Sequence, residues 1–490
     1  MSADFSNIKP IAFYLPQFYE TPYNSEWWGE GFTEWTAARR GEPIFAGHQQ
    51  PQLPPTGVED LGFHNQSELE TLTAQAKLAK AHGIYGFCHY FYWFGGKRVL
   101  EAPTELMLAN AQVDIPFCLS WANENWSRRW DGGEQDILIA QNYDPETYAD
   151  FAADLAPYFS DPRYITSGGK AVFLIYRAQE IPQLERLARE IRACAMACGH
   201  KGALVLGTET FITPGQQADP RELGLDGAVE FPPHGVSPRQ IHMMTAQGEP
   251  AFDGMVFDHA SAVSALMRRP APNYPLFRGV FPAWDNTARR GRRATIFAGS
   301  SPELFAHWLY IMSDWTQRQH GAGAQFIFIN AWNEWAEGAH LEPDTHNGAA
   351  YLETVRGVLN GAREPRIKFD WEQSSPESLA SFSEQLGAEF SAEAQLGGQE
   401  LDASASNYSY QLLLSRETMQ RRLGLKAGAK AKGARRRYNK PSQPWREHMR
   451  RARSFKEFKT ALWMAGYHDY PQTRWQKFTT AIIRGLSKTG

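Results

Sequence analysis

Short apolar runs alternate with longer stretches of helical character over the first 365 residues of the chain. Eight runs have the length and the β-branched and aromatic content of buried strands, and they cover residues 11–15, 84–90, 116–121, 171–176, 203–207, 227–231, 278–284 and 326–329. The clearest helical patterns between them cover residues 67–82, 145–158, 180–198 and 302–319. The last of these begins with Ser301 and Pro302, a favourable N-cap and first helical residue.

This alternation predicts the fold class. Strands that alternate with helices indicate a parallel sheet, and eight such strands indicate a closed (β/α)8 TIM barrel, here over residues 5–365. Because the fifth and sixth runs are short, a doubly wound open sheet is the alternative.

The composition changes after the predicted barrel. Residues 372–410 are rich in Ser, Glu, Ala and Gly, so we expect residues 366–410 to be a flexible linker. Residues 411–490 contain 20 Lys and Arg against 4 Asp and Glu, whereas residues 1–410 contain 30 against 50. Helical patterns around residues 410–425, 443–458 and 475–486 complete the prediction of a basic, largely helical C-terminal region.

The charge of the basic C-terminal region requires a separate explanation. Residues 435–437 are three consecutive arginines, and residues 446–453 add further Arg with aromatic side chains interleaved nearby. Each Lys or Arg near an anionic surface contributes about 1 kcal/mol. Anionic lipid, nucleic acid and acidic polysaccharide all fit, as does a solvated helical appendage. We expect contact with an anionic membrane surface or an acidic polysaccharide, and no nucleic acid.

The N-terminal residues indicate the compartment. Residues 1–10 have neither a basic segment nor an apolar core typical of a secretory signal. No apolar run approaches the length of a membrane span. We therefore expect a cytoplasmic protein, attached peripherally at the inner membrane if the basic region binds lipid.

Polar, acidic and aromatic residues follow the predicted strands. Barrel enzymes build their sites from strand ends and the loops after them. We therefore expect the following residues to bind substrate: Tyr14, Gln17, Trp28, Glu34, Trp35, His89, Tyr92, Trp93, Trp121, Asn123, Glu124, Trp126, Tyr176, Glu209, Glu230, His234, Trp284 and Asn333. For any single one of these, a packed loop is the plainer interpretation. It is the convergence of eight strand ends that favours a site.

The last strand leads into the sharpest candidate for chemistry. Glu334 and Glu337 follow it at a spacing of three residues, flanked by Trp332 and Trp335. Paired carboxylates cleave glycosidic bonds, at separations of about 5–5.5 Å in retaining enzymes and about 6.5–9.5 Å in inverting ones. Indole rings pack against sugar faces, and aromatic residues make up 13% of the chain. The pair thus predicts a carbohydrate-active site.

The spacing leaves alternatives open. It does not choose between the two carboxyl separations, and Glu337 could instead cap a following helix. Glu124, Glu209 and Glu230 are reserve candidates for the acid chemistry. Glu124 could also orient a neighbour or bind a sugar hydroxyl.

Six longer motifs resemble a known family. They are YLPQF at 14–18, WWGEGFTEW at 27–35, HYFYWF at 89–94, WANENW at 121–126, VEFPPH at 229–234 and NAWNEWAEG at 330–338. Together they resemble the WbsX-like family, which is related to glycoside hydrolase family 99, the endo-α-mannosidases and endo-mannanases. The resemblance covers about residues 8–355.

The resemblance implies a different catalytic role for each of the two carboxylates. In family 99 the matching Glu-Trp-x-Glu motif carries both catalytic acids, so Glu334 would deprotonate the substrate's own 2-hydroxyl. That oxygen would attack the anomeric carbon to give a 1,2-anhydro sugar, while Glu337 protonates the leaving oxygen and later activates water. The implied function is a retaining, endo-acting glycoside hydrolase on a surface polysaccharide or its precursor. No metal and no organic cofactor are implied.

Two other functions compete with hydrolysis. WbsX-like sequences occur among surface-polysaccharide functions, so a glycosyltransferase or transglycosylase of lipopolysaccharide or O-antigen biosynthesis is one alternative. The chain has no Asp-x-Asp metal motif, which weakens a nucleotide-sugar mechanism but not transglycosylation. A non-catalytic glycan-binding protein is the other alternative, and the presence of both Glu334 and Glu337 disfavours it.

Overall fold

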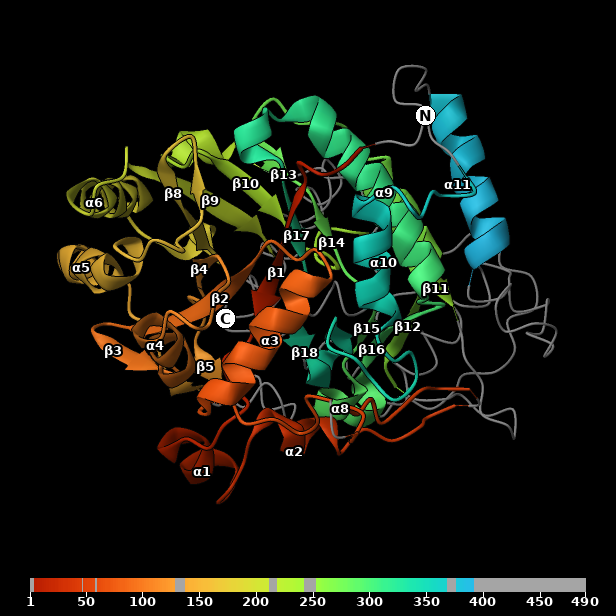
Figure 1. Cartoon of the computed structure of the whole chain (residues 1–490), viewed down its shortest axis with the longest axis horizontal. Helices are drawn as coiled ribbons and strands as arrows, with labels where there is room; N and C mark the ends of the chain where they lie inside the picture. The colour runs from red at the N-terminus through yellow and green to blue at the C-terminus, as the bar shows by residue number, and fades with distance from the viewer. Residues whose placement is uncertain are drawn as a thin grey trace, which may run out of the picture. The chain divides into compact units, whose positions relative to one another are not determined.

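The structure is a computed structural model, and it describes residues 4–45, 47–57, 60–127, 137–210, 218–241, 253–367 and 376–391. The predictions for the basic C-terminal region at 411–490 lie outside the described residues. The described residues lie within residues 1–401, which form one compact unit (Figure 1).

Eight parallel strands form a barrel, as predicted. They are β1 (Lys9–Tyr14), β2 (Gly86–Phe94), β4 (Phe117–Trp121), β8 (Lys170–Ile175), β9 (Ala203–Glu209), β10 (Gly227–Glu230), the paired segments β13 (Leu276–Phe277) and β14 (Gly279–Val280), and β17 (Phe326–Ile329). The segments β13 and β14 are two halves of the seventh strand, separated only by Arg278. Because β13 pairs with β10, and β14 pairs with β17, the sheet closes on itself. This confirms the (β/α)8 barrel and excludes the open sheet.

Helices surround the barrel and bury its outer face (Figure 1). They are α3 (Leu69–Ala81), α4 (Ala102–Ala109), α5 (Tyr148–Phe159), α6 (Leu184–Ala197), α7 (His259–Met267), α9 (Pro302–Gln319) and α10 (Ala350–Leu359). The four helical patterns predicted between the barrel strands are all confirmed. In α9 the hydroxyl of Ser301 accepts a hydrogen bond from the Leu304 amide at 3.2 Å, which is the expected cap.

The long connections at the carboxyl ends of the strands carry additional elements. Helices α1 (Pro22–Trp28) and α2 (Glu34–Ala38) follow β1. A second sheet consists of β11 (Gln240–Ile241), β12 (Met255–Asp258), β16 (Thr295–Ala298) and β15 (Trp284–Asp285), and it lies beside α8 (Thr287–Arg290) (Figure 1). Short strands β3 (Lys97–Val99), β5 (Trp126–Ser127), β6 (Ile137–Ile139), β7 (Thr166–Ser167), β18 (Asn333–Glu334) and β19 (Ala339–His340) form hairpins. The predicted run 278–284 therefore divides between the barrel and the second sheet.

A helix replaces part of the predicted linker. Helix α11 (Pro376–Phe390) contacts α7 and buries Phe382, Leu386 and Phe390 in the main core. The ring of Phe390 packs edge-on against His307 of α9, with centroids 4.8 Å apart. Three apolar residues at a spacing of four provide the buried stripe that docks the helix. Among the described residues, no helix has the length and apolar character needed to cross a bilayer.

Candidate active site

A cavity of about 450 Å³ lies at the carboxyl ends of the barrel strands. Its lining includes residues from β2, from the connections after β4, β8 and β10, and from β18. The second sheet supplies another wall. In a (β/α)8 barrel this end of the strands is where sites are built.

Aromatic rings form the floor of the cavity. Tyr90, Tyr176 and Phe231 line it, and Phe13 of β1 packs beneath them. Phe231 meets Phe13 edge-on at 4.8 Å and Tyr176 edge-on at 5.3 Å between ring centroids. This interlocked cluster closes the barrel interior below the cavity and gives the cavity an apolar base.

Further aromatic rings form the walls. Tyr92 and Trp126 pack edge-on, with centroids 5.2 Å apart. The second sheet contributes Trp284, Phe257 and Phe297 to the lining. Ring faces of this kind, combined with polar groups, suit a ligand that has both apolar and hydroxyl-bearing surfaces.

The two predicted carboxylates both line the cavity. Glu334 ends β18, and Glu337 ends the 3₁₀ turn η7 (Trp335–Glu337). Gly338 then turns the chain in the left-handed region at φ +62°. A Cβ at this position would come within 2.9 Å of the Asp285 backbone, so only glycine lets this turn lie against β15.

The carboxylate segment is the run from β18 to η7, residues 333–337, and Asn333 fixes its start. Its side-chain oxygen accepts from the Leu15 amide at 2.8 Å, and its side-chain nitrogen donates to the Leu15 carbonyl at 3.0 Å. The amide thus mimics a strand partner at the end of β1. It joins β18 to the barrel rim with two hydrogen bonds.

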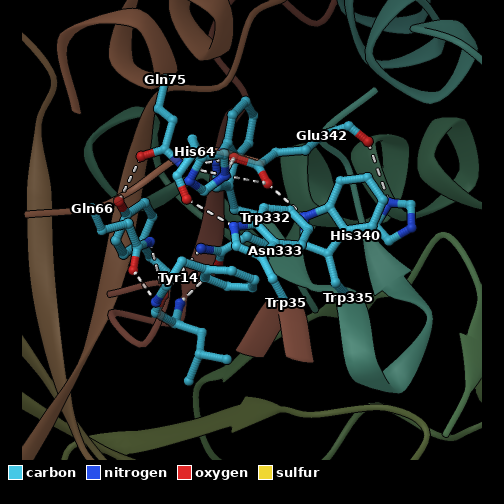
Figure 2. A network of polar contacts seen from close by, with 12 residues as sticks. Tyr14, Trp35, His64, Gln66, Gln75, Trp332, Asn333, Trp335, His340 and Glu342 are labelled. Carbon is cyan, nitrogen blue, oxygen red and sulfur yellow. Dashed lines mark hydrogen bonds and ion pairs between the residues drawn. The ribbon is translucent and has the colours of Figure 1, made fainter. Parts of the chain in front are cut away.

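A buried network of hydrogen bonds around Glu342 also supports the carboxylate segment (Figure 2). The Glu342 carboxylate accepts hydrogen bonds from Gln75 at 2.6 Å, and from the indole nitrogens of Trp332 at 3.0 Å and Trp335 at 2.6 Å. His64 pairs with it at 3.1 Å. Burial alone would raise the pKa of Glu342, but His64 and the donated hydrogen bonds outweigh burial and hold it below its usual range.

This network changes the role expected for the two indoles. The sequence places Trp332 and Trp335 beside the two carboxylates, where indole rings would suit a sugar, but both are almost fully buried, and their N–H groups point to Glu342 (Figure 2). His340 stacks on Trp335 with centroids 3.8 Å apart. The indoles therefore position the carboxylate segment and offer no face to the cavity.

Arg289 of α8 joins the two carboxylates. One terminal nitrogen donates to Glu337 at 2.6 Å, and the other donates to Glu334 at 3.0 Å. The second nitrogen also lies 3.4 Å from Glu34 of α2. Burial would lower the pKa of Arg289, but the three carboxylates outweigh it and raise the pKa further above its usual range. The guanidinium is therefore a fixed positive charge.

The environment of Glu334 makes it hard to ionise. Burial raises its pKa most strongly, Arg289 opposes this, and the neighbouring Glu337 and Glu34 add to the rise, so that the pKa reaches about 8. Burial likewise raises the pKa of Glu34, against the effect of Arg289. Three carboxylates thus share one guanidinium, and two of them, Glu34 and Glu334, belong to buried residues.

The structure brings eight of the predicted site residues together. Those lining the cavity are Tyr92, Glu124, Trp126, Tyr176, His234, Trp284, Glu334 and Glu337. Glu124 is held by Arg177 at 2.6 Å. Asn123 supports this corner, because its side chain accepts from the Arg177 amide at 2.8 Å and donates to Tyr143 at 3.1 Å.

Four predicted residues face the helical layer. Tyr14 donates to Gln75 of α3 at 2.6 Å, and Trp93 donates to Asp154 of α5 at 2.8 Å. Trp121 packs against Phe151 of α5 at 4.4 Å between centroids. His89 lies against Thr104 of α4, and burial lowers its pKa to about 3, so it stays neutral. None of the four lines the cavity.

Glu209 and Glu230 belong to a separate buried ion network. Arg269, which follows α7, pairs with both carboxylates, at 2.8 Å to Glu209 and 3.1 Å to Glu230. Arg278, between β13 and β14, donates to Glu230 at 2.9 Å. The network ties β9 and β10 to the seventh strand, and it does not line the cavity.

The remaining predicted residues support the rim. Trp35 donates its indole N–H to the His64 carbonyl at 2.7 Å, and Trp28 packs near Phe32 at 5.7 Å. Gln17 is fully buried, and its side-chain amide has no hydrogen-bond partner within the described ranges. Glu34 lies behind the cavity wall, where it contacts Arg289.

Sequence reasoning missed Arg289 and the floor rings Tyr90 and Phe231. Arg289 lies within TARRGRR at 287–293, directly after the predicted end of the seventh strand. An arginine-rich run at a strand end was a usable signal. Among the described residues, no group of three or more His, Cys, Asp or Glu side chains is arranged to hold a metal ion.

The family follows from the sequence comparison. The profile of the family described as glycosyltransferase WbsX matches residues 10–355. The chain therefore belongs to the WbsX family, as the motifs predicted.

Two curated relatives have no assigned function. Both are named uncharacterized protein WxcX, from Xanthomonas campestris pv. campestris strains B100 and ATCC 33913, and each is 40% identical over 352 residues. The aligned region covers 72% of this chain and 50% of each relative, so the chain spans about half the length of the curated relatives it matches.

Solved structures with a similar chain course include glycoside hydrolases. The GH99 endo-alpha-mannosidase from Bacteroides thetaiotaomicron is 16% identical, with a TM-score of 0.43, over 71% of this chain and 96% of that chain. A glycoside hydrolase-like protein is 14% identical, with a TM-score of 0.44, over 74% of this chain and 95% of that chain.

Proposed function

We propose that the protein is a retaining, endo-acting glycoside hydrolase that acts on a surface polysaccharide or its precursor. One observation carries the proposal: Glu334 and Glu337 bind the two terminal nitrogens of a single guanidinium in the wall of an aromatic-lined cavity. Their side chains therefore converge on one place. A sugar ring against the aromatic rings would lie within reach of both.

In the proposed reaction, Glu334 acts as the base. It takes the proton of the sugar's 2-hydroxyl, and that oxygen forms a bond to the anomeric carbon as the bond to the leaving oxygen breaks. Glu337 gives its proton to the leaving oxygen, which departs as a hydroxyl. Glu337 then takes a proton from water, whose oxygen opens the 1,2-anhydro ring, and Glu334 returns its proton to the 2-oxygen. Two inversions at the anomeric carbon give net retention.

The exposure of the two carboxylates fits these roles. The Glu337 side chain is 24% exposed and the Glu334 side chain 8% exposed. The residue that must exchange protons with the leaving group and with water is thus the one that solvent reaches. A base must be ionised before it acts, and burial raises the pKa of Glu334 to about 8, so we expect the acidic limb of the activity profile to lie above the pH usual for a glutamate.

The test is the substitution Glu337→Gln, which keeps the side chain's shape and removes its proton transfer. We expect turnover to fall by about 10²–10⁴-fold, while glycan binding and the unfolding midpoint are retained. A screen of surface polysaccharides and oligosaccharides with this variant would trap the substrate without cleaving it, and reducing-end analysis of the wild-type products would report the stereochemistry.

Glu124→Gln is the matched control, because Glu124 also lines the cavity but pairs with Arg177 instead of Arg289. We expect it to change KM more than kcat. If Glu337→Gln cleaves a verified substrate as fast as the wild type does, the assignment of the acid is wrong.

Transglycosylation is the second candidate, and the description of the WbsX family as glycosyltransferases favours it. The same two carboxylates would serve, with an acceptor sugar hydroxyl replacing water in the second step. Incubating the enzyme with substrate and acceptor sugars separates the two: products longer than the substrate indicate transfer, and only shorter products indicate hydrolysis. A chain that binds the trapped glycan but never cleaves it would be a binding protein.

A further inference from the structure

Arg289 stands in an unusual electrostatic position. Its side chain is 8% exposed, and its two terminal nitrogens meet Glu34, Glu334 and Glu337. A surface pair would be weak and exchangeable, but a buried arginine bound by several carboxylates is held in one orientation. The three carboxylates come from three different segments: α2, β18 and η7.

Glu34 differs from the other two carboxylates. It is fully buried, does not line the cavity, and accepts no hydrogen bond from any residue in the described ranges. Its polar contact is the ion pair with Arg289, at 3.4 Å. Glu34 is therefore outside the lining that a substrate would touch, and its link to the cavity is the contact with Arg289.

Glu34 and Glu334 compete for the same nitrogen. The Arg289 nitrogen that donates to Glu334 at 3.0 Å is the one that lies 3.4 Å from Glu34, whereas the other nitrogen donates to Glu337 at 2.6 Å. An Arg289 guanidinium that also interacts with Glu34 stabilises the ionised form of Glu334 less strongly. The packing of α2 and α8 against η7 fixes this geometry.

We propose that Arg289 is a positioning residue that aligns Glu334 and Glu337, and that Glu34 is a counter-carboxylate that limits how strongly Arg289 stabilises the ionised form of Glu334. This inference rests on the proposed function for its role in catalysis. The electrostatic coupling itself can be measured without a substrate.

Other charged and titratable groups surround the three carboxylates. Those that line the same cavity or lie next to its lining are Tyr90 and Tyr92 of β2, Tyr176, Glu124 with Arg177, His234 and Arg290. Asp285, on the strand β15 that packs against η7, pairs with His48. Burial raises the pKa of the three phenols well above their usual range, so they stay neutral. Because His234 also lines the cavity, the experiment uses a readout that is specific to Glu334.

The coupling predicts opposite effects of two substitutions. Arg289→Met removes the positive charge, so the pKa of Glu334 should rise, by about one unit or more. Glu34→Gln removes a competing negative charge and leaves more of Arg289 to Glu334, so the pKa of Glu334 should fall. Arg289→Lys keeps the charge and should return the pKa toward the wild-type value.

The experiment is a ¹³C NMR titration of the full chain labelled at the glutamate carboxyl carbons. The Glu334 signal is assigned by its loss in Glu334→Gln. Where a substrate has been verified, the acidic limb of the kcat/KM profile should move in the same directions as the NMR midpoint. A substrate that is never found would leave the NMR result valid while the proposed function fails.

Arg269→Lys and Arg269→Met are the matched controls, because Arg269 also bridges two buried carboxylates but lies outside the cavity. They should lower the unfolding midpoint without moving the Glu334 titration. If Arg289→Met does not fold, Glu34→Gln and Arg289→Lys still decide the question. An unchanged Glu334 midpoint in Glu34→Gln, or a rise, overturns the proposal.

Discussion

At the scale of single residues, the alternation of side chains along a strand decides which of them reach the cavity. On β2, Tyr90 and Tyr92 line the cavity, whereas His89 and Trp93 meet the helices. Successive side chains of a strand point to opposite faces. Both faces of a barrel strand are buried and apolar, so the sequence shows no alternation that would tell one face from the other.

Two tryptophans provide a test of this distinction: Trp121 ends β4, and Trp126 begins β5, the next strand along the chain. Trp126 lines the cavity, whereas Trp121 packs against α5. We expect Trp126→Ala to weaken glycan binding by about 1–2 kcal/mol, roughly tenfold in affinity, with little change in stability. We expect Trp121→Ala to cost about 3–5 kcal/mol of unfolding free energy.

Binding of the trapped glycan to each variant in the Glu337→Gln background, alongside urea unfolding, checks both statements. Equal losses of stability in the two variants would show that Trp126 is also a core residue. The comparison uses the same substitution at both sites, so side-chain size does not enter.

At the scale of elements, the carboxylate segment depends on supports that lie far away in sequence. Glu342 binds both indoles of the segment and is itself held by His64 and by Gln75 of α3 (Figure 2). Asn333 adds the attachment to the end of β1. The segment from β18 to η7 is short, so its geometry comes from these attachments and not from its own backbone.

Glu342→Gln tests the support. It removes the charge and places an amide N–H₂ among groups that donate, so we expect a loss of about 2–4 kcal/mol of unfolding free energy at neutral pH. Because the folded pKa of Glu342 is depressed, its charge stabilises the fold above the unfolded pKa, and this stabilisation is lost as pH falls through the folded pKa. The wild type and the variant should therefore converge in stability at acidic pH.

Urea unfolding at pH 7 and at successively lower pH measures the gap between the two proteins. A gap that stays constant with pH would mean that the substitution acts through packing alone. Lys80→Met, which removes an exposed ion pair with Asp114, is a control with little expected effect at any pH.

Helix α11 is an element whose structure differs from the one that its composition predicted. The stretch around it is rich in Ser, Glu, Ala and Gly, which favoured a linker. Phe382, Leu386 and Phe390 are few, but their spacing places all three on one face that α7 and α9 cover. Average composition dilutes such a stripe, whereas helical periodicity would have revealed it.

At the scale of the whole molecule, charge is divided between an acidic body and a basic C-terminal region. The basic region lies outside the described residues, so its partner stays a prediction from composition. We expect the full chain to bind vesicles containing anionic lipid at low salt. Replacing Arg435, Arg436 and Arg437 with Gln should weaken binding by about 3 kcal/mol, roughly a hundredfold.

Vesicle co-sedimentation at increasing salt measures this binding, with neutral-lipid vesicles as the control. Loss of binding with added salt is expected, because exposed charges are screened. A full chain that ignores anionic vesicles at low salt but binds an acidic polysaccharide would assign the region to the glycan instead.

The sequence by itself determined the order of strands and helices, the barrel, the family and the position of Glu334 and Glu337 at the eighth strand. Each of these depends on local patterns of apolar residues or on motifs that are contiguous in the chain. The tertiary structure decided which strand residues face the cavity, that Trp332 and Trp335 are supports, and that Arg289 joins three carboxylates. Those outcomes depend on contacts between segments tens to hundreds of residues apart, such as Glu34, Arg289 and Glu334, and no local pattern records them.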